Sequence, residues 1–218
     1  EEIIRNGDDE ILPRIIINEQ WGRFLGFVLG DGYIGGSNTV AISCDKRDVE
    51  IIDWIELFLR GIGIKPRRYY KRNTHSPVNP ITDPNGVDIR SPSRTLRLIM
   101  EKIGFRGIQG KVLEIPKIIL ESPKRVIREF LRGLFESDGT VGKEGAVCLS
   151  FTTKSRILAF QVQVVLLGFG IKANMRKKYN KKYQRNYFTL YLTREFIDIF
   201  HKEIGFISNR KKEGSLYK

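Results

Sequence analysis

Two aspartates, Asp31 and Asp138, stand at the same place in two copies of one sequence pattern. Residues 24–32 read FLGFVLGDG and residues 131–139 read LRGLFESDG, which places the aspartates 107 residues apart and in register. Two carboxylates that face each other repel unless a cation lies between them. A hard divalent ion such as Mg²⁺ binds oxygen ligands, activates water and stabilises charge on a phosphoryl oxygen. The repeated aspartate therefore predicts a metal-dependent site to which each copy contributes one carboxylate.

The residues before each aspartate predict how the two copies meet. Gly26 and Gly30 are four residues apart, as are Gly133 and Ser137, so each pair lies on one face of a helix. Small residues on that face let two helix backbones approach closely. An aspartate at a helix C-terminus opposes the helix dipole, so packing alone does not account for one in both copies. We expect paired helices with their terminal aspartates together, an arrangement suited to a nearly two-fold substrate such as duplex DNA.

The same order of elements is predicted after each of these helices. Hydrophobic spacing, glycines and prolines indicate a helix, two strands, a helix, two strands and a final helix in each half. The expected helices span residues 19–31, 48–60 and 93–103 in the first half and 123–138, 155–167 and 194–204 in the second. The fold class is therefore α+β, with two pseudo-symmetric αββαββα halves. The predicted divisions are an N-terminal arm at 1–18, a first half at 19–105, a linker at 106–122 and a second half at 123–218.

The chain is strongly basic. Its 218 residues carry a net charge of +13 and give a pI of about 9.8, which is the usual footprint of a nucleic-acid-binding protein. The sequence contains no long uncharged apolar run, so no membrane-spanning helix is expected, and no signal peptide is apparent. Cys44 and Cys148 lack metal-ligand spacing, and His75 and His201 stand alone, which argues against a zinc site. We expect an intracellular, cytoplasmic protein without a membrane partner.

Much of the positive charge lies in two matched stretches. IKPRRYYKR at 64–72 has five Lys or Arg and KANMRKKYNKKYQR at 172–185 has seven, with no acid in either, and both follow a Gly-Ile-Lys landmark. Strand alternation would send one set of side chains outward, where arginine can bind guanine edges or phosphates. A merely solvated charged face is the alternative. The predicted DNA-binding residues are Lys65, Arg67, Arg68, Tyr69, Lys71, Arg72, Arg90, Lys172, Arg176, Lys178, Lys182 and Arg185.

The two motifs resemble those of the LAGLIDADG homing endonucleases of the single-chain, two-motif type. The resemblance extends from about residue 19 to about residue 207 and includes motif, spacing and element order. It implies that the halves pack through paired motif helices and that their antiparallel sheets form a saddle over double-stranded DNA. It also implies a monomer that hydrolyses one phosphodiester in each strand of a long pseudo-palindromic site. The implied biological role is the mobility of an intron or intein.

The resemblance assigns the metal ligands. Asp31 and Asp138 correspond to the metal-binding aspartate of the family motif. Gly30 and Ser137 correspond to the preceding residue, which offers a backbone carbonyl. The implied cofactor is Mg²⁺, with Mn²⁺ or Ca²⁺ able to substitute in binding.

The resemblance also implies basic residues beside the scissile phosphates. In the second half that residue is Lys154, and in the first half it is Arg47, with Lys46 beside it. Such a cation would orient the attacking water or stabilise the transition state. The sixth motif position is often acidic in the family; it is Glu136 in the second copy but Leu29 in the first.

A different reading of the same scaffold stays open at this point. Some members of the family assist intron RNA folding as maturases, and others have lost cleavage and act as DNA-binding proteins. Loss of the aspartates would indicate a silent binder, and both aspartates are present. Maturase activity is compatible with intact motifs, so intron RNA is a second candidate partner.

Overall fold

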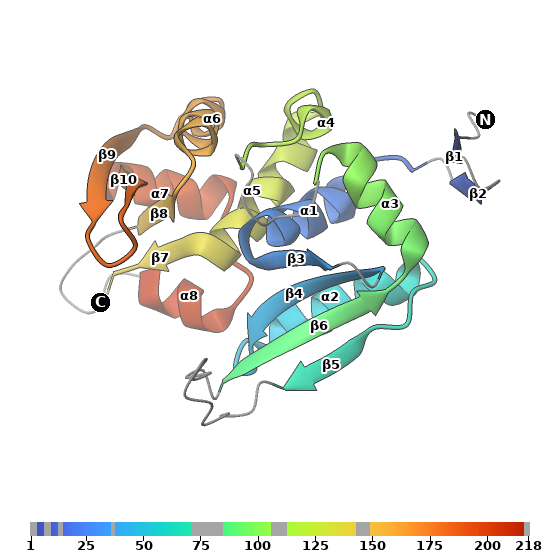
Figure 1. Cartoon of the computed structure of the whole chain (residues 1–218). Helices are drawn as coiled ribbons and strands as arrows, with labels where there is room; N and C mark the ends of the chain where they lie inside the picture. Colours follow the sequence, from blue (N-terminus) through green and yellow to red (C-terminus); the bar gives the residue numbers. More distant parts are fainter. Residues whose placement is uncertain are drawn as a thin grey trace.

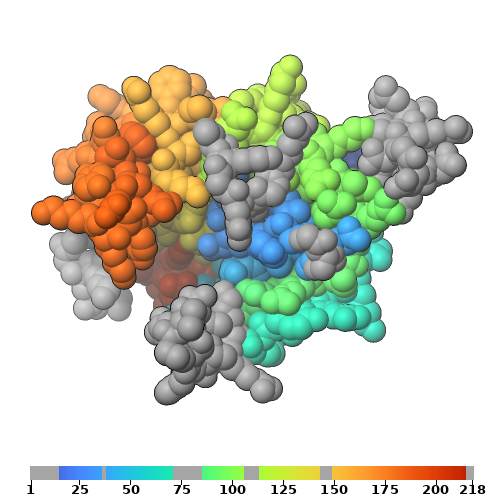
Figure 2. Space-filling view, viewed as in Figure 1, coloured from blue at the N-terminus to red at the C-terminus, as the bar shows by residue number. Residues whose placement is uncertain are grey.

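A computed structural model of the chain describes residues 4–6, 10–12, 15–35, 38–70, 85–105, 113–142 and 149–215. Within these ranges the chain forms two α+β halves with one order of elements (Figure 1). In the space-filling view the halves lie side by side, the first in blue to green and the second in yellow to red (Figure 2).

Each half alternates helices with pairs of antiparallel strands. The first half contains α1 (Glu19–Asp31), β3 (Gly32–Gly35), β4 (Thr39–Asp45), α2 (Val49–Gly61), β5 (Arg67–Tyr70), β6 (Gly86–Pro92) and α3 (Arg94–Ile103). The second half contains α5 (Lys124–Asp138), β7 (Gly139–Val141), β8 (Leu149–Thr153), α6 (Arg156–Leu167), β9 (Ala173–Asn180), β10 (Arg185–Leu192) and α7 (Arg194–Glu203). The strand orders, β3-β4-β6-β5 and β7-β8-β10-β9, are equivalent. The predicted αββαββα order is confirmed in both halves.

In the part of the chain that the structure describes, four elements lie outside this repeated pattern, and they were not predicted. Strands β1 (Ile4–Asn6) and β2 (Glu10–Leu12) pair within the N-terminal arm. Helix α4 (Lys117–Leu120) lies in the linker, and α8 (Asn209–Ser215) packs near β7 (Figure 1). The exact division of the chain into arm, halves and linker stays a prediction. Among the described residues, no helix is long and apolar enough to cross a bilayer.

Local sequence explains where the helices begin and end. The side-chain oxygen of Asn18 accepts a hydrogen bond from the backbone N–H of Trp21 at 3.0 Å and so caps α1. Ser155 caps α6 in the same way. After α2 and α6 the chain reverses through Gly63 and Gly170, whose φ angles of 79° and 75° are in the left-handed region that favours glycine. These turns lead to the basic strands at the same point of each half.

The two halves meet through α1 and α5, which cross with their backbones in contact. A Cβ at Gly26 would overlap the carbonyl oxygen of Phe130, and a Cβ at Gly133 would overlap that of Arg23. Only glycine fits at such a crossing, because any side chain would force the helices apart. The predicted close pairing of the motif helices is confirmed.

Among the described residues, helices pack against one face of each sheet, and the other face carries exposed side chains. On β6, Val87 and Ile89 are buried, whereas Arg90, the next residue along the strand, is exposed. On β8, Phe151 is buried and Thr152 is exposed. Because successive side chains of a strand point to opposite faces, Arg90 and Thr152 mark the uncovered side. We call this side the open face of each sheet.

Candidate active site

The two aspartates lie at the C-terminal ends of the crossing helices. Helix α1 ends at Asp31 and α5 ends at Asp138, and a glycine then begins the first strand of each half. A Cβ at Gly30 would overlap the side chain of Ser137 and lie 3.6 Å from Cγ of Asp138. The two terminal turns are therefore in contact, and they bring the aspartates of both motifs to one place.

The proximity of the Asp31 and Asp138 carboxylates changes the pKa of Asp138. Asp31 is exposed, whereas Asp138 is partly buried. Burial and then the negative charge of Asp31 raise the pKa of Asp138 from 3.8 to about 7, against a smaller opposing effect of the Lys211 ammonium. Both causes disfavour the charged carboxylate. A bound cation would relieve both, because it replaces lost hydration and lies between the two charges.

The oxygen donors at the helix ends fit a hard divalent cation. Carboxylates and backbone carbonyls are the ligands that Mg²⁺ binds, and Mg²⁺ sites commonly use one or two carboxylates plus water and phosphate oxygens. The Ser137 hydroxyl donates to the carbonyl oxygen of Gly133 at 3.2 Å, so its backbone carbonyl is the candidate ligand. Within the described part of the chain, no group of three or more His, Cys, Asp or Glu is arranged to hold a metal. Asp31 and Asp138 would thus need substrate or water oxygens to complete the coordination shell.

The predicted basic residues stand directly after the second strand of each half. Lys154 follows β8, while Lys46 and Arg47 follow β4, and all three are exposed. Arg47 is paired with Asp45: its Nε donates to Oδ1 at 3.0 Å and its Nη2 to Oδ2 at 2.5 Å. The hydrogen bond from Arg47 lowers the pKa of Asp45. Because Arg47 would have to leave Asp45 to meet a phosphate, the two halves present unequal cations.

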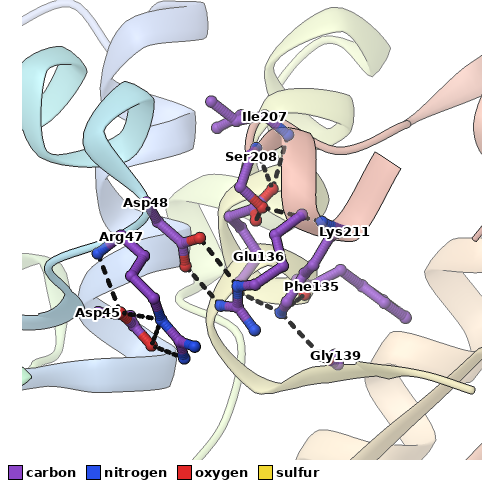
Figure 3. A network of polar contacts seen from close by, with 10 residues as sticks. Asp45, Arg47, Asp48, Phe135, Glu136, Gly139, Ile207, Ser208 and Lys211 are labelled. Carbon is purple, nitrogen blue, oxygen red and sulfur yellow. Dashed lines mark hydrogen bonds and ion pairs between the residues drawn. The ribbon is translucent and has the colours of Figure 1, made fainter. Parts of the chain in front are cut away.

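A buried lysine that the sequence did not reveal lies beside the second motif (Figure 3). Lys211 Nζ donates to the carbonyl oxygens of Phe135 at 3.0 Å and Gly139 at 2.7 Å, and to that of Glu136. Lys211 is 8% exposed, and burial lowers its pKa. Lys211 belongs to no recognisable motif, so only the folded chain shows that it belongs to this site.

The sixth motif position shows how the two copies have diverged. Glu136 is buried and accepts hydrogen bonds from the Ile207 backbone N–H at 2.6 Å and from the Ser208 hydroxyl at 2.5 Å (Figure 3). The equivalent Leu29 is buried in the apolar core. Glu136 therefore anchors the C-terminal segment, a contact that Leu29 at the same position of the first copy cannot make.

The first-half sheet carries predicted DNA-binding residues on its open face. Arg67 on β5 lies opposite Arg90 on β6, and Tyr69 lies two residues further along the same face of β5. The Arg90 guanidinium lies 4.2 Å from the centre of the Tyr69 ring. All three side chains are exposed, so they present cationic and aromatic groups to solvent.

Arg68 lies on the other face of β5, contrary to its predicted place among the DNA-binding residues. Its Nε donates to Oε1 of Glu56 at 2.5 Å, and its Nη2 lies 3.2 Å from Oδ1 of Asp53, both on α2. The pairing lowers the pKa of Glu56 and raises that of Arg68. One step along a strand reverses the face that a side chain occupies, which explains the difference. Lys71 and Arg72 lie outside the described residues.

The second-half sheet presents a similar open face. Arg176 and Lys178 on β9 lie opposite Thr189 and Tyr187 on β10, and both basic side chains are exposed. The Arg176 guanidinium lies 5.2 Å from the centre of the Tyr191 ring, which parallels the arginine–tyrosine pair of the first half. Further exposed basic residues at strand ends and in the connecting turn are Lys65, Lys172, Lys182 and Arg185.

Comparison with known sequences finds matches to segments of longer proteins. Residues 125–205 match a family model described as a LAGLIDADG-like domain. The replication factor C small subunit of Methanocaldococcus jannaschii is 29% identical over 96% of this chain and 11% of its own length. The tRNA-splicing ligase RtcB of Pyrococcus furiosus is 28% identical over 73% of this chain and 18% of its own length. The chain therefore spans only a small part of these curated relatives.

Comparison with solved structures identifies the fold. A structure of mesophilic variants of the homing endonuclease I-DmoI superposes with a TM-score of 0.60 at 14% identity, over 86% of this chain and 96% of that one. I-DmoI in complex with DNA and Mn gives a TM-score of 0.59 at 14% identity, over 87% and 98% of the two chains. The N-terminal LAGLIDADG domain of DUF199/WhiA gives 0.57 at 16% identity, over 89% and 84%. The chain therefore has the two-domain LAGLIDADG fold that is also seen in I-DmoI and WhiA, and the LAGLIDADG-like family model matches its residues 125–205.

Proposed function

We propose that the protein is a site-specific endonuclease that cuts both strands of DNA with a divalent metal held by Asp31 and Asp138. The observation that carries the proposal is the meeting of these two carboxylates at the ends of duplicated helices, where the pKa of Asp138 is raised to about 7. Perturbed carboxylates of this kind concentrate at functional sites. The fold relative I-DmoI has been crystallised with DNA together with Mn and with Ca, which supports a divalent metal and a DNA substrate.

The residues around the aspartates have separable roles in this proposal. Bound there, Mg²⁺ would supply an activated water and stabilise the charge that develops on the phosphoryl oxygens. Asp31 and Asp138 would hold the ion, with the carbonyls of Gly30 and Ser137 as further candidate ligands. Because the two helices are related by a two-fold axis, each half would act on one phosphodiester of one DNA strand. A monomer would therefore be enough to cut both strands.

Basic residues after β4 and β8 would stabilise the charge on the reacting phosphates. Lys154 would act in the second half. In the first half Arg47 would act once a phosphate competes with Asp45, with Lys46 adjacent. Arg47 is already in an ion pair with Asp45, whereas Lys154 follows β8, where the sequence is different. The two DNA strands would therefore be cut at unequal rates.

The open faces of the two sheets would bind the two halves of the target site. A net charge of +13 favours association with a polyanion. The arginine–tyrosine pairs of both sheets would contact base edges and sugars, since arginine reads guanine through two hydrogen bonds. The proposed DNA-binding residues are Lys65, Arg67, Tyr69, Arg90, Lys172, Arg176, Lys178, Lys182 and Arg185.

The curated relatives support a role in homing of an intron or intein. Matching segments occur in a replication factor C small subunit, an RtcB ligase, a probable translation initiation factor IF-2 and an RNA polymerase subunit. These segments occupy 11% to 23% of those proteins. A segment shared by proteins with such different names does not determine any of their named activities. A mobile inserted element explains this distribution, and such an element acts on DNA inside its own cell.

A binding protein without cleavage is the second candidate. The likeness to the LAGLIDADG domain of WhiA favours it, because that scaffold also serves a protein outside the endonucleases. The presence and proximity of both aspartates favour the nuclease. We do not extend the proposal to intron RNA.

The two candidates are separated by a cleavage assay with matched variants. The protein is incubated with a plasmid library of uninterrupted host-gene sequences, in Mg²⁺ or in EDTA, and new DNA ends are sequenced. We expect staggered double-strand cuts at one site in Mg²⁺ only. Asp31→Asn and Asp138→Asn should abolish double-strand cutting but retain binding, whereas Asp198→Asn, an exposed residue of α7, should cut normally. Cutting that persists in EDTA, or in both motif variants, would overturn the proposal; specific binding without any cutting would establish the second candidate.

A further inference from the structure

The C-terminal helix α8 lies against the candidate active site and contacts both halves of the molecule. The residues involved run from Ile207 to Lys211, and we call them the C-terminal clasp. Figure 3 shows them between the end of α5 and the residues that follow β4. The clasp is not part of either repeated half, so its contacts are additional to the fold that the two motifs define.

On the second-half side, the clasp closes the end of α5. The last carbonyl groups of a helix have no partner within the helix. Lys211 Nζ donates to the carbonyl oxygens of Phe135 and Glu136 in the last turn of α5 and to that of Gly139, the residue after the helix. The Phe135 carbonyl oxygen also accepts from the Gly139 backbone N–H. A cation at a helix C-terminus also interacts favourably with the helix dipole. The residues that Lys211 holds lie on both sides of Ser137 and Asp138, so it fixes the turn that carries both candidate metal ligands.

The clasp is itself anchored to α5 by a buried carboxylate. Glu136 accepts hydrogen bonds from the Ile207 backbone and from the backbone and hydroxyl of Ser208. The Ser208 hydroxyl also lies 3.4 Å from the Lys211 backbone nitrogen. Glu136, Ser208 and Lys211 are buried, where a hydrogen bond left unmade costs more than at the surface. The position of Lys211 is therefore over-determined by contacts to the same helix.

On the first-half side, the clasp holds the residues that follow β4. Arg210 Nε donates to Oδ1 of Asp48 at 2.9 Å and Nη2 to Oδ2 at 2.5 Å. The Asp48 side chain is 6% exposed, and a bidentate pair of this kind fixes geometry as well as charge. Asp48 directly follows Lys46 and Arg47, the candidate first-half cations. Helix α8 therefore links the turn that carries Ser137 and Asp138 in the second half to the turn that carries Lys46 and Arg47 in the first half.

We propose that Lys211 is a positioning residue of the metal site, which holds the α5 turn so that Ser137 and Asp138 face the end of α1. The inference rests on the proposed function for its catalytic consequence, but metal binding tests it independently. Groups that orient metal ligands without touching the metal typically contribute about 10- to 100-fold to metal affinity or activity. Lys211 is buried and is not among the exposed basic residues proposed to bind DNA, so its loss should leave DNA affinity unchanged.

The test compares Lys211→Met, which keeps length and removes the donors, with Lys212→Met on the exposed side of α8. Mn²⁺ affinity of the metal-free full chain is measured by electron paramagnetic resonance, and folding is checked by circular dichroism. We expect Lys211→Met to weaken Mn²⁺ binding by about tenfold or more, and Lys212→Met to leave it unchanged. DNA affinity measured in EDTA should be equal in the wild type and both variants, and a fall in turnover with unchanged KM should accompany the loss of metal binding.

A second variant covers the case in which Lys211→Met does not fold. Ser208→Ala keeps the lysine but loosens its anchor, and it should weaken Mn²⁺ binding in the same direction by a smaller factor. If both variants fold and bind Mn²⁺ as the wild type does, the inference is overturned while DNA cleavage by the wild type stays intact. If the wild type cuts no DNA but Lys211→Met still loses Mn²⁺ affinity, the proposed function fails and the inference stands.

Discussion

Replacing Asp138 with asparagine should stabilise the metal-free protein, and more so as the pH rises. Burial and the Asp31 charge raise the pKa of Asp138 from 3.8 to about 7. Between these two values the unfolded chain has an ionised carboxylate while the folded chain retains the proton. The folded state therefore loses stability as the pH rises from about 4 to about 7 and regains none above it. Asparagine has nearly the same shape and no charge, so the variant should escape this loss.

The size of the effect follows from the shift. A shift of about 3 units corresponds to about 4 kcal/mol at most, at about 1.4 kcal/mol per unit. Asp138 keeps some solvent exposure, and solvent screening reduces the expected gain to about 1 to 2 kcal/mol above pH 8. For a chain of this size, that is an increase of about 2 to 8 °C in melting temperature. At pH 4 the two proteins should melt within about 1 °C of each other.

The assay is thermal unfolding in EDTA at a series of pH values from 4 to 8.5. Asp31→Asn should give part of the same gain, because it removes the second cause of the shift. Asp198→Asn, exposed on α7, should give no pH-dependent gain. Adding Mg²⁺ at pH 8 should raise the melting temperature of the wild type and not that of Asp138→Asn. Parallel pH profiles for the wild type and Asp138→Asn would refute the claim that the two carboxylates are held together in a partly buried site.

Four further outcomes are expected. Gly26→Ala should lower the unfolding free energy in urea by about 1 to 3 kcal/mol, because its methyl group overlaps the Phe130 carbonyl; Gly61→Ala, with nothing within 4 Å, should not. Arg176→Ala should weaken DNA binding and reduce its salt slope by about 1 for each phosphate that the side chain neutralises, whereas Arg68→Ala, paired on the helix-covered face, should leave the slope unchanged. Lys154→Ala should slow cleavage of one strand more than the other, seen as accumulated nicked plasmid; equal slowing of both would contradict a half-specific role. Mg²⁺ binding near pH 6.5 should release about one proton from Asp138, measured by calorimetry in buffers of different ionisation enthalpy, and binding without proton release would contradict its raised pKa.

The parts of the fold that repeat were readable from the sequence. Identical spacing of small residues, aspartates and Gly-Ile-Lys turns predicted both halves, the helix crossing and the meeting of Asp31 with Asp138. These features depend on local periodicity and on the comparison of the first half of the sequence with the second. No contact between residues distant in sequence had to be guessed. These predictions succeeded because the two copies within the chain can be aligned with each other.

The parts that occur once were not readable. Lys211 lies beside Glu136 only because α8 folds back over 70 residues to the end of α5, and Lys211 is outside the repeated pattern that would mark it. Arg68 was misplaced because strand composition does not tell which residue of a basic pair faces the helices. That choice is set by pairing register, and a shift of one residue inverts it.

A crossing built from backbone atoms has a consequence for how such a molecule changes over time. Where Gly26 and Gly133 meet the opposite helix, there is no side chain whose size could be adjusted, so the helix backbones themselves set the separation of the two helix ends that carry Asp31 and Asp138. If the proposed function holds, substitutions on the sheets would alter which DNA is recognised without altering the stagger of the cut. For an endonuclease of the proposed kind, exchange of one half for another would then vary the recognised sequence while the overhang keeps its length.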